Sequence, residues 1–124
     1  MNISHFGGTF SDVSLEEAYD MLKIRFGSGV NEFWISFEGE YPCLAVMING
    51  GLGSVTYFSD DSCAGSQSFG GENEGKSVTF YTNTPEEKTE LDGRYAVSSA
   101  LAVRAAREFI STGKRPECIE WAEL

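Results

Sequence analysis

The stretch CLAVMINGGLGSVTYF (residues 43–58) decides the fold of this chain. Its apolar residues Leu44, Val46 and Ile48 recur at every second position, which is the period of a β-strand. Residues 52–58 are rich in valine, threonine and aromatic side chains, as strands are. Asn49-Gly50 between the two segments supplies the backbone freedom of a tight turn. The sequence therefore predicts two antiparallel neighbouring strands joined by a hairpin.

The alternation extends upstream and, more weakly, downstream of this hairpin. Phe33, Ile35 and Phe37 predict a third strand, so that three strands form a meander. Residues 59–77 are polar and glycine-rich, which predicts a long loop with one short strand at Ser66–Phe69. Residues 78–82 (VTFYT) read as a strand, and residues 84–94 are charged and turn-like.

Two segments carry the spacing of amphipathic helices. Ser14 and Glu17 match a capping box, and the apolar residues that follow predict a helix over residues 14–26. A second stripe of apolar residues predicts a helix over residues 99–112, which Gly113 ends. We expect one α+β domain over residues 1–124, with a mostly antiparallel sheet and both helices packed on one of its faces.

The last predicted element is a short strand at residues 118–121. Ile119 and Trp121 point to the same face at period-two spacing. We expect Trp121 to be structural, anchoring this strand on the sheet or under a helix.

Charge narrows the possible partners. Nineteen acidic residues face nine basic ones, for a net charge of −10, so the surface should repel nucleic acid and anionic membranes. The sequence has no signal-peptide pattern and no apolar run long enough to span a membrane, so we expect a cytoplasmic protein. Residues 60–92 hold eight acids against two bases. This region fits either a solvated face or a surface that meets a basic partner.

The sequence offers no catalytic, cofactor or metal motif. His5 is the only histidine, lies beside no nucleophile and is expected to be a surface or edge residue. Cys43, Cys63 and Cys118 are odd in number and form no CxxC, which favours small buried side chains in a reducing compartment. The acids near residues 60–74 lack the spacing of a calcium loop. A binding protein is therefore expected, and an enzyme or small-molecule binder with scattered site residues is the alternative.

The segment AAREFISTGKRPECIEWAEL (105–124) resembles the C-terminal part of the first-numbered immunity-protein family of bacterial polymorphic toxin systems. The shared elements are a helix with a late Phe109, the basic-proline pair Arg115-Pro116, and the apolar–x–Trp pattern of Ile119-Glu120-Trp121. The segments NEFWISFEG (31–39), CLAVMINGG (43–51) and GSVTYFSDD (53–61) are also similar to strands of that family.

This resemblance implies an antitoxin that binds a cognate toxin domain and blocks its active site. We expect a one-to-one complex and no cofactor. Toxins of similar proteins include deaminases of nucleic acids, some acting on double-stranded DNA. Since a deaminase must present a basic nucleic-acid channel, an acidic inhibitor suits it. We expect the toxin contacts to be Asp60, Asp61, Phe69, Glu72 and Glu74.

The sequence leaves open whether three aromatic residues are exposed or buried. Phe69 is equally compatible with an exposed anchor and with a plug buried under the loop. Trp34 and Tyr57 offer a second candidate surface on the outward side of the strands, but core packing is the expected role of both.

Overall fold

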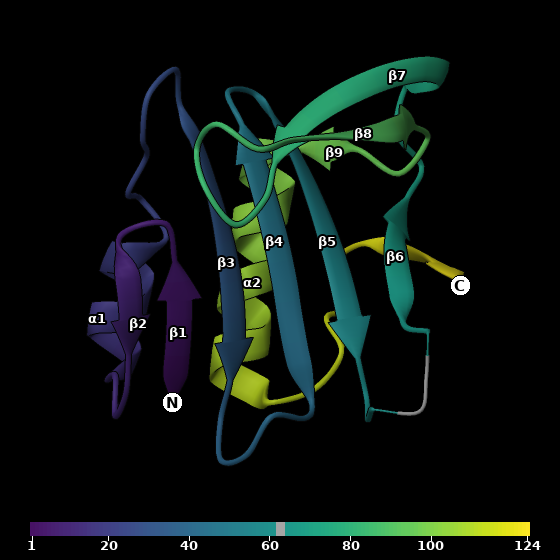
Figure 1. The fold of residues 1–124 in the computed structure, drawn as a ribbon. Helices are drawn as coiled ribbons and strands as arrows, with labels where there is room; N and C mark the ends of the chain where they lie inside the picture. Colours follow the sequence, from purple (N-terminus) through teal and green to yellow (C-terminus); the bar gives the residue numbers. More distant parts are fainter. Residues whose placement is uncertain (62–63) are drawn as a thin grey trace.

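The structure, a computed structural model, describes residues 1–61 and 64–124 of the chain. The predicted α+β fold is confirmed: an antiparallel sheet is covered by two helices on one face only (Figure 1). The elements in chain order are β1 (Asn2–His5), β2 (Gly8–Phe10), α1 (Leu15–Met21), β3 (Val30–Ser36), β4 (Cys43–Asn49), β5 (Leu52–Phe58), β6 (Ser66–Phe69), β7 (Asn73–Tyr81), β8 (Lys88–Gly93), β9 (Val97–Ser98), α2 (Ser99–Thr112) and β10 (Glu120–Glu123).

The large sheet has the strand order β10-β6-β5-β4-β3-β1-β2, and β9 pairs with β5 beside this path. The predicted meander β3-β4-β5 lies at its centre, with Val46 of β4 opposite both Phe33 and Val55. The loop between β4 and β5 consists of Gly50 and Gly51, since Asn49 pairs with Leu52. Gly50 has a φ of 57°, a backbone angle that favours glycine, so the predicted hairpin is confirmed.

The core lies between the sheet and the helices. Side chains of β3, β4 and β5 at every second position are buried on the helix side, where α2 lies on β4 and β5, and Phe33, Leu44, Val46 and Val55 are fully buried. Helix α2 meets them with the small residues Ala102, Ala105 and Ala106 and with Phe109 and Ile110. The approach is close at Gly53 of β5, where a Cβ atom would lie 2.5 Å from that of Ala102. Small side chains on both elements therefore let the helix lie directly on the sheet.

The second helix is confirmed, and the first is shorter than predicted. Helix α2 spans Ser99–Thr112 and ends at Gly113, which has a φ of 70°. Ser14 caps α1 with the predicted capping box, but the helix ends at Met21 and not near residue 26. It ends there because the amide of Ile24 bonds the carbonyl of Met21, three residues back, in a tighter turn. Among the described residues, no helix is long and apolar enough to span a membrane.

The segment after β5 holds more strand than the sequence predicts. Strand β6 lies at the predicted Ser66–Phe69, but β7 begins earlier than residue 78, at Asn73. The prediction of a turn over 84–94 is wrong, because β8 occupies Lys88–Gly93 and pairs with β7. The pairing is stabilised by polar contacts: the hydroxyls of Ser77 and Thr79 donate to the carboxylate of Glu90 at 2.6 and 2.8 Å. These hydrogen bonds across the strands lower the pKa of Glu90.

The β7-β8 hairpin crosses the upper end of the helix-free face of the sheet (Figure 1). Phe80 of β7 is fully buried there. Glu32 of β3, only 6% exposed, accepts hydrogen bonds from the Thr82 hydroxyl at 2.7 Å and the Asn83 amide at 3.0 Å. The Asn49 side chain donates to the carbonyl of Thr79 at 2.9 Å. The hairpin is thus attached through one buried ring and a small polar network.

The structural role predicted for Trp121 is confirmed. Strand β10 pairs with β6, and Trp121 packs half-buried against the core near Tyr57, with ring centroids 6.5 Å apart. The indole N–H donates to the carbonyl of Pro116 at 2.8 Å, and the Arg115 guanidinium lies 5.7 Å from the ring centroid. Tyr57 faces the core as predicted, edge-on to Phe109 at 6.1 Å.

Candidate functional site

The face of the central strands away from the helices is the most distinctive surface of the molecule. We call it the open face. It carries the outward residues of three strands, namely Glu32, Trp34 and Ser36 of β3, Cys43, Ala45 and Met47 of β4, and Ser54, Thr56 and Phe58 of β5. The expectation that Trp34 packs in the core is wrong, because its side chain is 43% exposed on this face. The reason is the strand period: with Phe33 and Ile35 buried in the core on the helix side, Trp34 must point the other way.

An aromatic pair lies at the centre of the open face. The rings of Trp34 and Phe58 stack with centroids 6.1 Å apart and an interplanar angle of 12°. A hollow of 240 Å³ on one side is lined by Trp34, Phe58, Met47 and Thr56, with Glu32 also contributing. A second hollow, of 260 Å³, lies between Trp34, Tyr41 and Glu40. A third hollow, of 150 Å³, is lined by Trp34, His5 and Asn83, so Trp34 forms a wall shared by three shallow hollows.

The predicted site residues Asp60 and Asp61 lie just beyond the end of β5. Because Ser36, Cys43 and Phe58 are in register, the link between β3 and β4 leaves the sheet at this same end. That link contains Glu38 and Glu40, both exposed. Four acidic residues thus lie at one end of the central strands, and the sequence prediction included only two of them.

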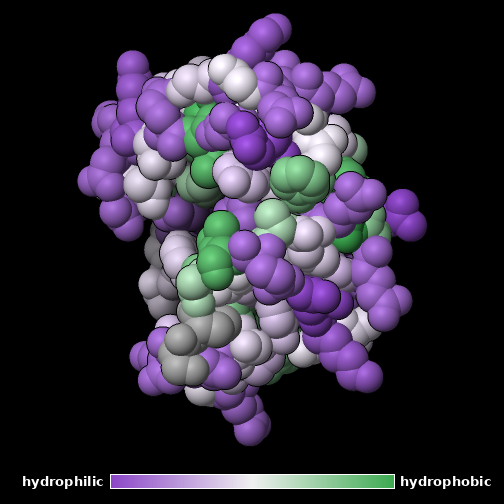
Figure 2. Space-filling model, turned by 90° about the vertical axis from the view of Figure 1, so that its right-hand side faces the viewer, coloured by the Kyte–Doolittle hydropathy of each residue, from purple (hydrophilic) through white to green (hydrophobic). Residues whose placement is uncertain are grey.

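Phe69, also predicted, is the last residue of β6, and Glu72 follows three residues later. They lie at the end of β6 away from the two aspartates, because its first residue, Ser66, pairs with Tyr57 near the end of β5 (Figure 1). They line a groove of 560 Å³ at the β6-β10 edge together with Leu52, Leu101 and Glu120. Phe69 is 41% exposed and tilts against Tyr95 at 6.3 Å. Figure 2 faces this side, where small hydrophobic patches are set in a mostly hydrophilic surface.

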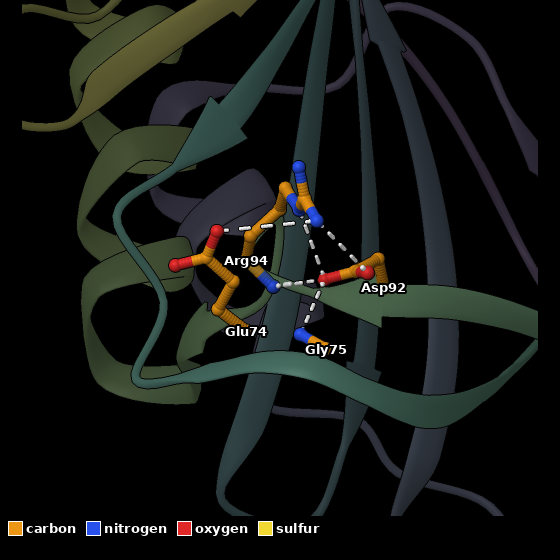
Figure 3. Close-up of polar contacts among 4 residues, drawn as sticks. All are labelled: Glu74, Gly75, Asp92 and Arg94. Carbon is orange, nitrogen blue, oxygen red and sulfur yellow. Dashed lines mark hydrogen bonds and ion pairs between the residues drawn. The ribbon is translucent and has the colours of Figure 1, made fainter.

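Glu74 is held within the base of the hairpin. Its carboxylate lies 3.9 Å from the Arg94 guanidinium, which also contacts Asp92 at 3.2 Å (Figure 3). The Asp92 carboxylate accepts bonds from the amides of Arg94 and Gly75. These hydrogen bonds lower the pKa of Asp92. The side-chain hydrogen bond between Arg94 and Asp92 raises the pKa of Arg94. The structure thus brings Phe69 and Glu72 together, and leaves the Asp60–Asp61 pair apart from them.

His5 differs from its prediction as a surface or edge histidine. Strand β1 pairs on both sides, and the imidazole lies half-buried near three phenylalanine rings, with centroids 5.4 Å from Phe10, 6.1 Å from Phe26 and 5.7 Å from Phe33. Its Nδ1 accepts a bond from the amide of Gly7, and burial lowers its pKa. A neutral ring held in this way is a packing group.

The cysteines and acids give no metal centre in the described part of the chain. Outside residues 62–63, no group of three or more His, Cys, Asp or Glu side chains could hold a metal ion. Cys43 is buried and Cys118 is half-buried, where burial raises the pKa of its thiol. Cys63 lies outside the described residues.

The distribution of charged residues along the sequence could have pointed to the open face. No lysine or arginine occurs between Arg25 and Lys76, a stretch that contains all of β3, β4, β5 and β6. Seven acids fall in that stretch: Glu32, Glu38, Glu40, Asp60, Asp61, Glu72 and Glu74. The central sheet is therefore purely acidic among its charged residues.

Comparison with known proteins finds matches among immunity proteins. Residues 16–123 match the family described as immunity protein Imm1. A protein of Burkholderia cenocepacia (strain H111), named double-stranded DNA deaminase immunity protein, is 26% identical over 125 residues, and the match covers all of both chains. The family match spans far more than half of the chain, in agreement with the resemblance seen in its strands and C-terminal segment. This chain belongs to the Imm1 immunity protein family.

Proposed function

We propose that this protein binds and inhibits a cognate toxin domain, and that the toxin is a deaminase acting on DNA. Membership of the immunity family carries the proposal, and the name of the similar Burkholderia protein supports the toxin class. The protein acts by binding and not by catalysis, in a one-to-one complex in the cytoplasm of the cell that it protects.

The chemistry of a deaminase explains why charge matters here. A deaminase guides a nucleic-acid strand along a basic channel to its active site. A protein of net charge −10 whose central sheet carries only acids can cover that channel and compete with phosphates. Long-range attraction also speeds the encounter, so the toxin is captured before it reaches DNA.

The proposed contacts on this chain are Asp60, Asp61, Phe69, Glu72 and Glu74. The exposure of Phe69 favours an anchor over a buried plug. The two aspartates follow β5, near the Ser66 end of β6, while Phe69 and Glu72 line the groove at its other end, and Glu74 follows two residues later, so the contacts form two patches. Glu74 is the weakest of the five, because Arg94 already neutralises part of its charge.

The function is tested with the toxin domain encoded beside the gene for this chain. Co-expression should restore growth to cells that make the toxin, and the purified pair should run as a one-to-one complex. Adding the protein should stop deamination of a double-stranded DNA substrate in vitro. A protein that gives no protection and no complex would disprove the proposal, and protection from a toxin of another chemistry would disprove the deaminase part.

The contact patches are tested by paired charge reversals. Asp60→Lys with Asp61→Lys, and separately Glu72→Lys with Glu74→Lys, should each slow association and weaken binding. Asp20→Lys with Glu117→Lys is the matched control, because it changes the net charge equally at exposed positions on the helix side. If all three double variants bind alike, the effect is one of net charge and the proposed patches are wrong.

A further inference from the structure

We infer that the open face is a docking surface for an arginine-bearing segment of the toxin, with Trp34 as its central anchor. This inference rests on the proposed function and deepens it by naming the surface and the chemistry that it recognises.

Two large aromatic side chains are exposed on or beside the open face. Trp34 is 43% exposed and Tyr41 is 39% exposed, and both line the same 260 Å³ hollow. The opposite face of the same strands buries its large side chains almost completely under α2. A large exposed aromatic beside shallow hollows is the usual form of an interface anchor, since it offers area at little entropic cost.

The second observation is the distribution of charge over the whole molecule. The stretch from residue 26 to 75, which forms the central sheet, contains seven acids and no base. Six of the nine bases belong to α2 or to the segments that follow α1 and α2: Lys23, Arg25, Arg104, Arg107, Lys114 and Arg115. The other three, Lys76, Lys88 and Arg94, belong to the β7-β8 hairpin or the residue after it. Arg115 lines a hollow with Ser59 and Glu123 near the end of β5 and already bonds Glu123. The hollow of Trp34 and Tyr41 has Glu40 as the one charged residue in its described lining, which favours a cationic partner.

The third observation selects arginine among cations. The face of an indole ring attracts a guanidinium, whose planar shape also stacks on it. Glu40 lines the same hollow as Trp34 and Tyr41, so a guanidinium lying on Trp34 has a carboxylate beside it. Such a pairing of ring and carboxylate already occurs inside this protein, where Arg115 lies over Trp121 and bonds Glu123 at 2.9 Å.

Other occupants of the face fit less well. A second copy of this chain would bring two acidic faces together, and like charges in contact cost free energy. Nucleic acid is repelled for the same reason. Glu32 is already used, since it accepts bonds from Thr82 and Asn83, so the carboxylates left for a partner lie at the end with Glu38, Glu40 and Asp61.

The test measures binding of the catalytically inactivated toxin domain to purified variants. Trp34→Ala should weaken binding at least about tenfold, mainly through faster dissociation, as anchors do. Phe10→Ala is the matched control, because Phe10 is 37% exposed on β2, outside the three strands of the open face, and it should change binding less than twofold. Glu40→Lys provides a second variant that leaves the ring in place and should also weaken binding about tenfold.

The outcomes separate this inference from the function on which it rests. If the wild-type chain does not bind the toxin, the proposed function fails. If the wild type binds and Trp34→Ala and Glu40→Lys both bind within twofold of it, the open face is not the docking surface. Loss of binding only on reversal of Glu72 and Glu74 would place the toxin at the β6-β10 groove instead. A wild-type dimer that Trp34→Ala separates would show that a second copy occupies the face.

Discussion

Replacing Trp121 by alanine tests how strongly β10 is attached to the fold. The indole packs on the core beside Tyr57 and donates a hydrogen bond of 2.8 Å to the carbonyl of Pro116. Removing a large core side chain costs about 3–5 kcal/mol when it is fully buried. Because Trp121 is half-buried, we take about 2 kcal/mol for lost packing and add about 1 kcal/mol for the hydrogen bond. Trp121→Ala should therefore lower the free energy of unfolding by about 3 kcal/mol.

This loss is measured by urea unfolding followed by far-UV circular dichroism. In a domain of this size it corresponds to a fall in Tm of roughly 10 °C. Trp121→Phe keeps most of the packing and loses only the N–H donor, so it should cost about 1 kcal/mol. Trp34→Ala is the matched control for removal of an exposed tryptophan and should stay within about 1 kcal/mol of the wild type.

If Trp121→Ala unfolds at the same urea concentration as the wild type, the indole does not hold β10 on the fold. A variant that keeps its stability but no longer binds the toxin would make Trp121 an interface residue. If Trp121→Ala loses both stability and binding, the Trp121→Phe protein separates the two effects. It stays folded and should still bind the toxin if the role of Trp121 is structural.

Three further changes probe the contacts that shape the sheet. Gly53→Ala places a Cβ atom 2.5 Å from that of Ala102, so urea unfolding should show a loss of about 1–3 kcal/mol in the free energy of unfolding. Adding Ala102→Gly should recover part of that loss. Equal stability of Gly53→Ala and the wild type would contradict the close approach. Glu32→Ala removes the carboxylate that holds Thr82, so amides of the β7-β8 hairpin should exchange hydrogen faster while those of β4 stay protected, and unchanged hairpin exchange would count against this attachment. His5 has a pKa lowered by burial from its ordinary value of 6.5, so the unfolded chain takes up its proton first: the stability that the neutral ring contributes is complete above about pH 6.5 and is lost as the pH falls below it. His5→Phe should remove that part of the slope of stability against pH, and an unchanged slope would show that other groups cause it.

The sequence predicts those elements whose pattern is local. The meander follows from alternation and from the Gly50 turn, and α2 follows from its apolar stripe and Gly113. Strand β8 escapes prediction because its stability comes from its partner: Glu90 forms its hydrogen bonds with Ser77 and Thr79, eleven or more residues earlier. Helix α1 is cut short by a tight turn that its apolar spacing does not reveal.

The candidate site is less predictable than the fold for a related reason. Alternation separates Trp34 from Phe33, but it does not say which of the two faces the helices will cover. The acids of the link between β3 and β4 join Asp60 and Asp61 only through the register of three strands. Local composition therefore identified an acidic region, while the grouping of its carboxylates depends on tertiary structure.

The close contact of Gly53 with Ala102 has a consequence for how such a protein diversifies. On the helix side, each strand position is fixed by what fits under α2, so few substitutions there are tolerated. On the opposite side, the same strands carry residues such as Thr56 and Trp34 that the fold does not need to bury. Alternate positions along one strand thus serve packing on the helix side and binding on the open face. A new binding specificity can arise on the open face without a new fold. A toxin that changes its surface can be followed by substitutions at the exposed and half-buried positions of this face, namely Trp34, Ser36, Met47, Thr56 and Phe58.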